Sequence, residues 1–388
     1  MTQLLNSFLL NKKLHILFLC GWYPSRVLPT NGDFIQRHAE AVSLLHKVSV
    51  LHIVSDENCL KNVEIESKEI NGIKTYIGYV KKTNNVILKF IRFWRTYFIL
   101  LQKMKPFDVV HLNETFPFGI FALHLKWFQK KPFIISEHWT GYHFPQSKKI
   151  NFFVKSISKK IVKNASFICP VSNDLNKSMQ QFRLKGNYKN IPNVVDTSLF
   201  KPQEKEKTAF TVVHISSLLD DHKNVSGMLR VAKKLETEIG AFTWKFIGGT
   251  SKEFSSLISN LDFTGARIEF INHIHQQDLV EELQSSTVFV LFSNYENLPC
   301  VILESFSCGI PVIATNVGGI SEFFPKNFGK LITVNNENEL LESLLLYNNN
   351  LKIDAEKMHK YAVKKFSKKV IAVQFSELYF TSLNNSNS

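Results

Sequence analysis

The stretch Thr287-Val-Phe-Val-Leu-Phe-Ser-Asn-Tyr-Glu-Asn-Leu-Pro-Cys-Val-Ile-Leu-Glu-Ser-Phe-Ser-Cys-Gly-Ile-Pro311 decides the fold. Its first six residues are short, apolar and rich in β-branched side chains, which predicts a buried strand. Pro299 suits the first turn of a helix, where a missing N–H costs nothing. Gly309 and Pro311 then end that helix. The predicted order is a strand, a polar loop with Glu296, and a helix with Glu304 in its second turn.

The two glutamates therefore lie on either side of a helix N-terminus. The free N–H groups and partial positive charge of such a terminus suit a phosphate. A carboxylate on each side can accept hydrogen bonds from the hydroxyl groups of a ribose and of a hexose. The alternative is that Glu296 and Glu304 only solubilise an amphipathic helix, since most glutamates are exposed.

Beyond Glu304 the chain continues to Gly309-Ile-Pro-Val-Ile-Ala-Thr-Asn-Val-Gly-Gly319. This stretch resembles the family 4 retaining glycosyltransferases of the GT-B fold, whose signature is E-x7-E followed by G-x-P-V-I-A-T-x-x-G-G. The resemblance implies a nucleotide-sugar donor, with Glu296 on the sugar hydroxyls and Glu304 on the ribose. The residues that would face the sugar and diphosphate are Asn297, Leu298, Pro299 and Cys300.

Short apolar runs alternate with helical patterns along both halves of the chain. Alternation of this kind predicts α/β domains with parallel sheets, and ligands at the carboxyl ends of the strands. With the resemblance, the expected fold is GT-B, with two doubly wound Rossmann-like domains facing across a cleft. The expected strands are 14–20, 47–54, 108–112, 132–136, 166–170, 210–215, 243–247, 268–270, 287–292, 311–314 and 330–332.

A proline-bounded stretch, Ile191-Pro-Asn-Val-Val-Asp-Thr-Ser-Leu-Phe-Lys-Pro202, marks the domain boundary and resembles the family's interdomain sequence. We expect an N-terminal acceptor-binding domain and a C-terminal nucleotide-sugar-binding domain. A last helix should cross back onto the first domain and be followed by a disordered tail. The corresponding ranges are 1–195, 196–365, 366–381 and 382–388.

Two loops of the N-terminal half are candidates for the site. Gly32 opens a helix after the first strand, and a glycine there allows backbone N–H groups to approach a diphosphate. The alternative for Gly32 is an ordinary turn between strand and helix. His138 follows the strand at 132–136, and the resemblance implies that it contacts the donor sugar near the reaction centre. The alternative for His138 is a packed loop histidine beside Trp139.

The segment from His214 to Asn224 corresponds to the family's diphosphate-binding sequence G-R-L-x-x-x-K-N/G. Lys223 and Asn224 match that pattern, but Ser217 stands where the family has arginine. Either another cation supplies the missing positive charge, with Arg26 and Arg37 as candidates, or the site for the leaving group is weaker. Two further donor-binding candidates follow the next strands: Gly248, and Asn272 in the loop beside the nucleotide base.

Composition limits the classes of partner. The chain has 388 residues, 44% of them hydrophobic, and a net charge of +14. Residues 1–195 hold 28 Lys and Arg against 11 Asp and Glu, which favours an anionic partner. No nucleic-acid-binding motif is present. Five scattered cysteines and an N-terminal apolar run that fits a first strand predict a cytoplasmic protein without a signal peptide or membrane span.

Two basic amphipathic stretches, 86–105 and 148–163, lie in the acceptor-binding half. Either could dock on an anionic bilayer, at the inner face of the cell membrane. The alternative is that both are surface helices whose apolar faces pack on the sheet.

The predicted activity is that of a retaining hexosyltransferase, with His138, Glu296 and Lys223 carrying the chemistry. It would transfer a sugar to a glycan or lipid-linked saccharide in cell-surface polysaccharide synthesis. No cofactor is expected beyond the nucleotide-sugar co-substrate, and no metal, since His273 and His275 lack further ligands and no D-x-D motif occurs. The alternative is a non-catalytic nucleotide-sugar-binding subunit, which Ser217 favours.

Overall fold

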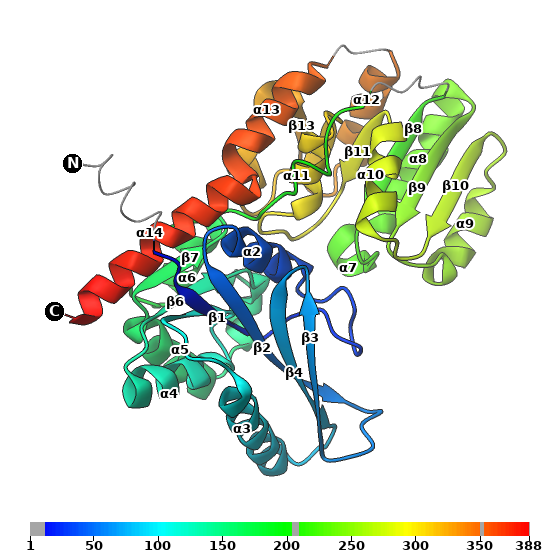
Figure 1. Ribbon diagram of the computed structural model, residues 1–388. Helices are drawn as coiled ribbons and strands as arrows, with labels where there is room; N and C mark the ends of the chain where they lie inside the picture. The colour runs from blue at the N-terminus through cyan, green and yellow to red at the C-terminus, as the bar shows by residue number, and fades with distance from the viewer. Residues whose placement is uncertain (1–11, 204–208, 350–352, 388) are drawn as a thin grey trace, which may run out of the picture. The chain divides into compact units, whose positions relative to one another are not determined.

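The computed structural model describes residues 12–203, 209–349 and 353–387, which fold into two compact units (Figure 1). Unit 1 comprises Met1–Val194 and Lys368–Ser388, and unit 2 comprises Val195–Ser367. Each unit is built around a largely or fully parallel sheet. Both therefore have the doubly wound α/β architecture that the alternating apolar runs predict.

The sheet of unit 1 has the order β3-β4-β2-β1-β5-β6-β7 among the described residues. All neighbours pair in parallel except β3 and β4. Strand β1 lies between β2 and β5, so the order of strands reverses there. The strands are β1 (His15–Cys20), β2 (Lys47–Asp56), β3 (Val63–Ile70), β4 (Ile73–Lys81), β5 (Val109–Asn113), β6 (Phe133–Glu137) and β7 (Phe167–Pro170).

The antiparallel hairpin β3–β4 was not predicted from the sequence. Its turn is Asn71-Gly72, with φ of 50° and 75°, and Asn-Gly is the dipeptide most typical of a two-residue hairpin turn. Strand β3 carries alternating charged residues and is only partly buried. It therefore shows little of the continuous apolar character by which the other strands are recognised.

Helices cover both faces of this sheet. Helices α2 and α14 pack together over one face, with Ile371, Phe375 and Tyr379 of α14 in the same core as β1. Helices α3, α4 and α5 lie beside one another on the other side of the sheet (Figure 1). The helices are α2 (Asp33–Ser43), α3 (Val86–Lys103), α4 (Gly119–Gln129), α5 (Phe152–Asn164), α6 (Asn173–Gln181) and α14 (Lys368–Asn387), with short 3₁₀ turns at Thr140–Tyr142 and Gln146–Lys149.

The expected last helix is present as α14 and packs on the core of unit 1, but its bounds and the expected tail differ from the structure. The helix expected over 366–381 is interrupted at Ser367, where α13 has ended and α14 has not begun. The disordered tail expected over 382–388 is instead helical as far as Asn387. Ser382 is fully buried and Leu383 packs on the core of unit 1, so tertiary contacts outweigh the polar composition of this segment.

Unit 2 has a fully parallel sheet in the order β10-β9-β8-β11-β12-β13. Its strands are β8 (Thr211–Ile215), β9 (Phe242–Ile247), β10 (Ala266–Ile271), β11 (Val288–Leu291), β12 (Val312–Thr315) and β13 (Gly329–Ile332). Its helices are α7 (Asp220–Lys223), α8 (Val225–Ile239), α9 (Ser255–Leu261), α10 (Gln276–Ser285), α11 (Cys300–Ser307), α12 (Glu337–Asn348) and α13 (Ala355–Phe366), with 3₁₀ turns at Lys252–Phe254, Ile320–Phe323 and Lys326–Phe328.

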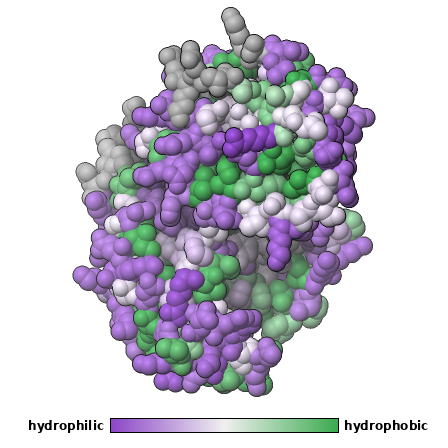
Figure 2. All heavy atoms as spheres, turned by 90° about the vertical axis from the view of Figure 1, so that its right-hand side faces the viewer, coloured by the Kyte–Doolittle hydropathy of each residue, from purple (hydrophilic) through white to green (hydrophobic). Residues whose placement is uncertain are grey.

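The central strands of unit 2, β8, β11 and β12, are mostly apolar, and all their residues except Thr211 are buried. Helices on both faces of a parallel sheet cover every side chain, which explains why these strands lack polar alternation. The unit's only tryptophan, Trp244, is fully buried and stacks on Phe246. Seen from the side shown in Figure 2, hydrophilic side chains cover most of the surface, and hydrophobic ones are interspersed in separate groups.

None of the described helices combines the length and the apolar character that a bilayer span requires.

Helix α14 should be essential to the stability of unit 1. Phe375 is fully buried and its ring contacts those of His38, His111 and Tyr379. Phe375→Ala should lower the free energy of unfolding of unit 1 by about 3–5 kcal/mol, through lost burial and the cavity left behind. Val373→Ala, on the exposed side of the same helix, should change it little. Urea unfolding of both variants, followed by circular dichroism, measures the difference.

Candidate functional site

The candidate donor site lies at the carboxyl edge of the sheet in unit 2. Strand β8 is first in the chain but lies between β9 and β11, so the strand order reverses between β8 and β11. In open α/β sheets this reversal leaves a crevice in which ligands bind. Lys223 is the last residue of α7, the short helix that follows β8, and Glu296 lies in the loop after β11.

Lys223 and Glu296 are in direct contact. The Lys223 ammonium donates to Glu296 Oε1 in an ion pair, and Ser293 Oγ donates to the same oxygen at 2.8 Å. The side chains are 18% and 11% exposed, so water screens the pair less than at an open surface. The structure thus brings together two of the three residues predicted to be catalytic, although they are 73 positions apart.

The turn after β12 fixes the path of the Glu296 loop. Thr315 Oγ1 donates to the carbonyl of Ser293 at 2.6 Å, and the N–H of Gly319 donates to the carbonyl of Asn297 at 2.8 Å. Gly318 has φ of 56°, and a Cβ at that position would overlap the carbonyl oxygen of Glu296. A residue with a side chain is therefore excluded at 318 on two grounds, the positive φ and the close backbone approach.

Asn224 has a structural role in this arrangement. It has φ of 51°, a left-handed conformation that asparagine and glycine tolerate best. Its Oδ1 accepts from the N–H of Gly227 and caps α8, and its Nδ2 donates to Asn335 Oδ1 at 3.0 Å. Both side-chain groups are therefore used within unit 2. They help fix the turn that positions Lys223.

A buried histidine, His214, stabilises the loop after β8 through hydrogen bonds. His214 lies 2.8 Å from the carbonyl of Val290 and 2.7 Å from Ser216 Oγ, which accepts from the N–H of Leu218. Burial lowers the pKa of His214 to about 3, and the nearby charge of Lys223 adds to the effect. Ser217, in the middle of this loop, is exposed. The position where the family has arginine is thus open to solvent.

Three other residues predicted to bind the donor differ in their location within unit 2. Gly248 has φ of 118°, and a Cβ there would overlap the carbonyl of Ser216, so packing within unit 2 already requires a glycine. Asn272 is exposed in the loop after β10. Pro299 is the N-cap of α11, one residue before the helix begins at Cys300.

Glu304 is fully buried inside unit 2. It is the fifth residue of α11, and its carbonyl accepts from the N–H of Cys308. Burial and the Glu304 carboxylate raise the pKa of the Cys308 thiol. Asn297 and Leu298 are also buried, at 7% and 3% exposure, whereas Cys300 is half-buried. The roles predicted for these residues toward a donor stay predictions.

In unit 1, Gly32 precedes α2 with φ of 74°. A Cβ there would meet the backbone of Trp22 and Tyr23, so the fold of the loop requires a glycine whatever the ligand. His138 follows β6, with its ring 4.5 Å from that of Phe34 and 5.4 Å from that of His38. Burial and the neighbouring histidines hold its pKa well below the usual range, so the imidazole is neutral at pH 7.

Two glutamates, Glu137 and Glu114, lie at the carboxyl edge of unit 1, and Glu114 was not predicted as a site residue. Glu137, at the end of β6, accepts hydrogen bonds from the backbone N–H of Thr115, His138 and Trp139, each at 3.0 Å, and so orders the His138 loop. Glu114 follows β5 with φ of 77°. Burial and the charge of Glu137 raise the pKa of Glu114 to about 9. An acidic residue two positions after the predicted strand 108–112 was the available signal for Glu114.

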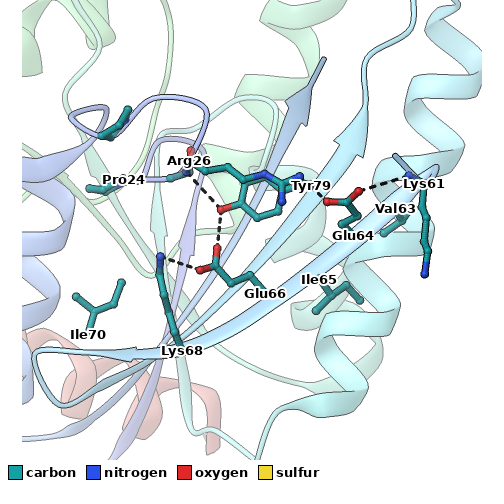
Figure 3. A pocket seen from close by; sticks show the side chains of 12 residues that line it. Pro24, Arg26, Lys61, Val63, Glu64, Ile65, Glu66, Lys68, Ile70 and Tyr79 are labelled. Carbon is teal, nitrogen blue, oxygen red and sulfur yellow. Dashed lines mark hydrogen bonds and ion pairs between the residues drawn. The ribbon is translucent and has the colours of Figure 1, made fainter. Parts of the chain in front are cut away.

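Arg26 has its guanidinium already paired with carboxylates of unit 1. It forms ion pairs with Asp56 at 2.7 Å and Glu64 at 2.6 Å, and its guanidinium lies 3.9 Å from the centre of the Tyr79 ring. Figure 3 shows Arg26, Glu64 and Tyr79 in a pocket of unit 1, where Tyr79 also donates to Glu66. Arg37 is likewise paired, with Asp33 at 3.0 Å. Neither arginine therefore offers the uncommitted charge that was expected to replace the one missing at Ser217.

Within the described part of the chain, no group of three or more His, Cys, Asp or Glu side chains is placed to hold a metal ion.

Comparisons with known proteins point to one family over both units. Residues 196–365 match the family model described as glycosyl transferases group 1, and residues 38–199 match that of glycosyltransferase family 4. TuaC of Bacillus subtilis, assigned as a glycosyltransferase of teichuronic acid biosynthesis, is 22% identical over 364 residues. That alignment covers 86% of this chain and 88% of TuaC.

Solved structures with the same fold cover nearly the whole chain. Sucrose-phosphate synthase of Thermosynechococcus elongatus has a TM-score of 0.76 at 16% identity, covering 96% of this chain and 100% of that one. HepE of Anabaena, solved in complex with UDP and glucose, has a TM-score of 0.72 at 16% identity, covering 94% and 98%.

The buried His214 should make unit 2 less stable in acid. In the unfolded chain its imidazole takes up a proton near pH 6.5, but in the folded chain it does so only near pH 3. The free energy of unfolding should therefore be fully retained above pH 6.5 and fall as the pH is lowered from there toward 3. His214→Gln should lower the slope of the unfolding free energy against pH by the amount that corresponds to about one bound proton. The exposed His273→Gln should leave the slope unchanged in denaturation series at several pH values.

Proposed function

The chain is a glycosyltransferase of the group 1 and family 4 type with the GT-B fold, and on this premise we propose that it transfers a sugar, with retention of configuration, from a nucleotide sugar to a glycan or lipid-linked saccharide. The observation that carries the proposal is the contact between Lys223 and Glu296 at the reversal of strand order in unit 2. One cation and one carboxylate meet where such sheets bind ligands.

The pair suits the two ends of a sugar diphosphate. Glu296 would accept hydrogen bonds from sugar hydroxyls, and Lys223 would neutralise the diphosphate as it leaves. The N-terminus of α11, which begins at Cys300, would add its free N–H groups and partial positive charge. Because Ser293 and the Gly318 turn already fix the loop, these groups need little rearrangement when charge develops on the leaving group.

Retention, by attack on the same face of the sugar from which the nucleotide leaves, is part of this proposal. So is independence from a metal ion, since Lys223 would supply the positive charge toward the diphosphate. No cofactor beyond the nucleotide sugar enters the reaction. Glu304 would hold the ribose, and His138 would contact the sugar from unit 1.

The relatives support an acceptor in cell-surface polysaccharide synthesis. TuaC is assigned to teichuronic acid biosynthesis, which supports such an acceptor, whereas HepE, solved with UDP and glucose, supports a nucleotide-sugar donor. We further propose that the acceptor glycan binds over unit 1 and that the reaction takes place in the cytoplasm, at the inner face of the cell membrane. The excess of lysine and arginine in residues 1–195 suits an acceptor that carries phosphate or carboxylate groups.

A second candidate function is nucleotide-sugar binding without turnover. The observation that favours it is the exposed Ser217, which offers no guanidinium to a diphosphate. Arginine binds phosphate oxygens in a bidentate manner that a serine hydroxyl cannot reproduce. The two functions differ in whether nucleoside diphosphate is released when an acceptor is present.

The first test uses a panel of UDP-, GDP- and ADP-sugars, scored for thermal stabilisation and for release of nucleoside diphosphate. One donor should raise the melting temperature and be consumed, and Glu296→Gln should lower its consumption by roughly 100-fold. Glu281→Gln, an exposed glutamate on α10, is the matched control and should behave as wild type. Full activity of a folded Glu296→Gln would contradict the assignment. Stabilisation without release would favour the binding function.

Restoring the arginine provides a second test. Because Ser217 is exposed, Ser217→Arg should be accommodated without overpacking. It should tighten binding of the nucleoside diphosphate by roughly tenfold or more, as a charge-assisted hydrogen bond allows. Isothermal titration calorimetry measures the change, with Ser256→Arg on the exposed side of α9 as the control. Equal affinities for the two variants would mean that the diphosphate does not lie beside position 217.

A further inference from the structure

Unit 1 exposes apolar side chains at the beginnings of two helices. Helix α3 starts with six consecutive exposed residues, Val86–Ile91, and five of them are apolar. Val86 is 79% exposed and Ile87 is 71% exposed. The first turn of α5 exposes Phe152 and Phe153, at 86% and 69%, and Phe144 in the preceding loop is 72% exposed. Large apolar side chains gathered in this way mark an interaction surface more often than chance.

The two helix beginnings extend in the same direction. Helices α3, α4 and α5 each lead from the carboxyl end of one strand to the next strand, so they run the same way. Trp94, in the third turn of α3, packs on Phe121 near the start of α4. Ile161, in the third turn of α5, faces Gly119, the first residue of α4. About two turns of α3 and of α5 therefore project beyond α4, roughly 10 Å each.

We call this surface the α3–α5 ridge. It consists of Val86, Ile87, Leu88, Phe90, Ile91, Phe144, Phe152 and Phe153.

Positive charge surrounds the ridge. Residues 70–107 contain eight Lys and Arg and no Asp or Glu, and residues 140–164 contain six and none. Lys89 lies among the exposed residues of α3, and Lys148 and Lys149 precede α5 and are also exposed. The Lys148 ammonium lies 4.6 Å from the centre of the Phe144 ring. Apolar and cationic groups thus occur together, without carboxylates between them in the sequence.

We propose that the α3–α5 ridge docks unit 1 on an anionic lipid bilayer. The apolar side chains would enter the boundary between headgroups and acyl chains, and the lysines would lie at the lipid phosphates. Charge complementarity selects this partner, because residues 70–107 and 140–164, which contain the ridge, carry Lys and Arg and no Asp or Glu, so that two copies of the ridge would repel each other. The proposal goes beyond the transfer reaction and does not depend on the identity of the donor.

The experiment is flotation of the full chain with two kinds of vesicle. One is phosphatidylcholine alone and the other is phosphatidylcholine mixed with phosphatidylglycerol. The protein should float with the mixed vesicles only, and less so as salt is raised, because ions screen the attraction. Equal flotation with both kinds, or with neither, would overturn the proposal.

Two pairs of variants test the ridge itself. Phe152→Ser with Phe153→Ser should lower the partition coefficient at least tenfold, and Lys148→Gln with Lys149→Gln roughly tenfold. The matched controls lie in unit 2: Leu346→Ser with Val363→Ser, and Lys364→Gln with Lys365→Gln, all at exposed positions. The controls should bind as wild type. Thermal stabilisation by the donor should be unchanged in all variants, so that loss of lipid binding is distinguished from loss of fold or of donor binding.

Other occupants of the ridge would give different results. Light scattering would show a dimer if a second copy of the chain covered the ridge. A dimer that dissociates in the Phe152→Ser and Phe153→Ser variant would overturn the lipid proposal in favour of that second copy. Residues 1–11 lie outside the described residues, and a variant without residues 2–11 tests them. Loss of flotation in that variant, with full flotation of the Phe152 and Phe153 variant, would overturn the assignment to the ridge.

Discussion

The close approach between Gly318 and the Glu296 carbonyl is the constraint on which the candidate donor site depends. The space that a side chain at 318 would need is filled by the backbone of the Glu296 loop. Together with the bonds from Thr315 and Gly319, this contact joins the loops after β11 and β12. Because the loop cannot move away from the turn, Glu296 is held where Lys223 can reach it. The glycine pair of the motif thus acts on the site through the backbone of Glu296.

Contacts within unit 2 also fix the loop after β8. His214 bonds to the neighbouring strand β11 and to Ser216, and the turn at Asn224 sets the position of Lys223. Hydrophobic burial of the strands fixes their carboxyl ends, and a few polar groups inside unit 2 then fix the loops. The residues that would meet a ligand need few interactions of their own. Buried groups fix the loops, and exposed residues would meet the ligand. One architecture can therefore serve different substrates when exposed positions such as Ser217 and Asn272 change.

The sequence predicted every described strand except β3 and β4, because a strand covered on both faces is a continuous apolar run. It missed β3 and β4, where only the Asn71-Gly72 turn marks the hairpin. At the site, the motif identified Lys223 and Glu296 but not their contact. The pairing of Arg26 with Asp56 and Glu64 could not be foreseen, since the partners are 30 and 38 positions away and no local pattern joins them. The helical end of the chain was missed because its polar composition conceals the contacts of Ser382 and Leu383.

The packing of α14 on unit 1 has a consequence for biosynthesis. Ile371, Phe375 and Tyr379 complete a core whose other members, such as Ile16 and Phe18, are translated before unit 2. Unit 2 is continuous in sequence and contains all of its own core, whereas unit 1 needs both ends of the chain. Unit 1 can therefore close its core only after unit 2 has been synthesised. For this protein the order in which domains finish folding on the ribosome is the reverse of the usual N-terminal-first order.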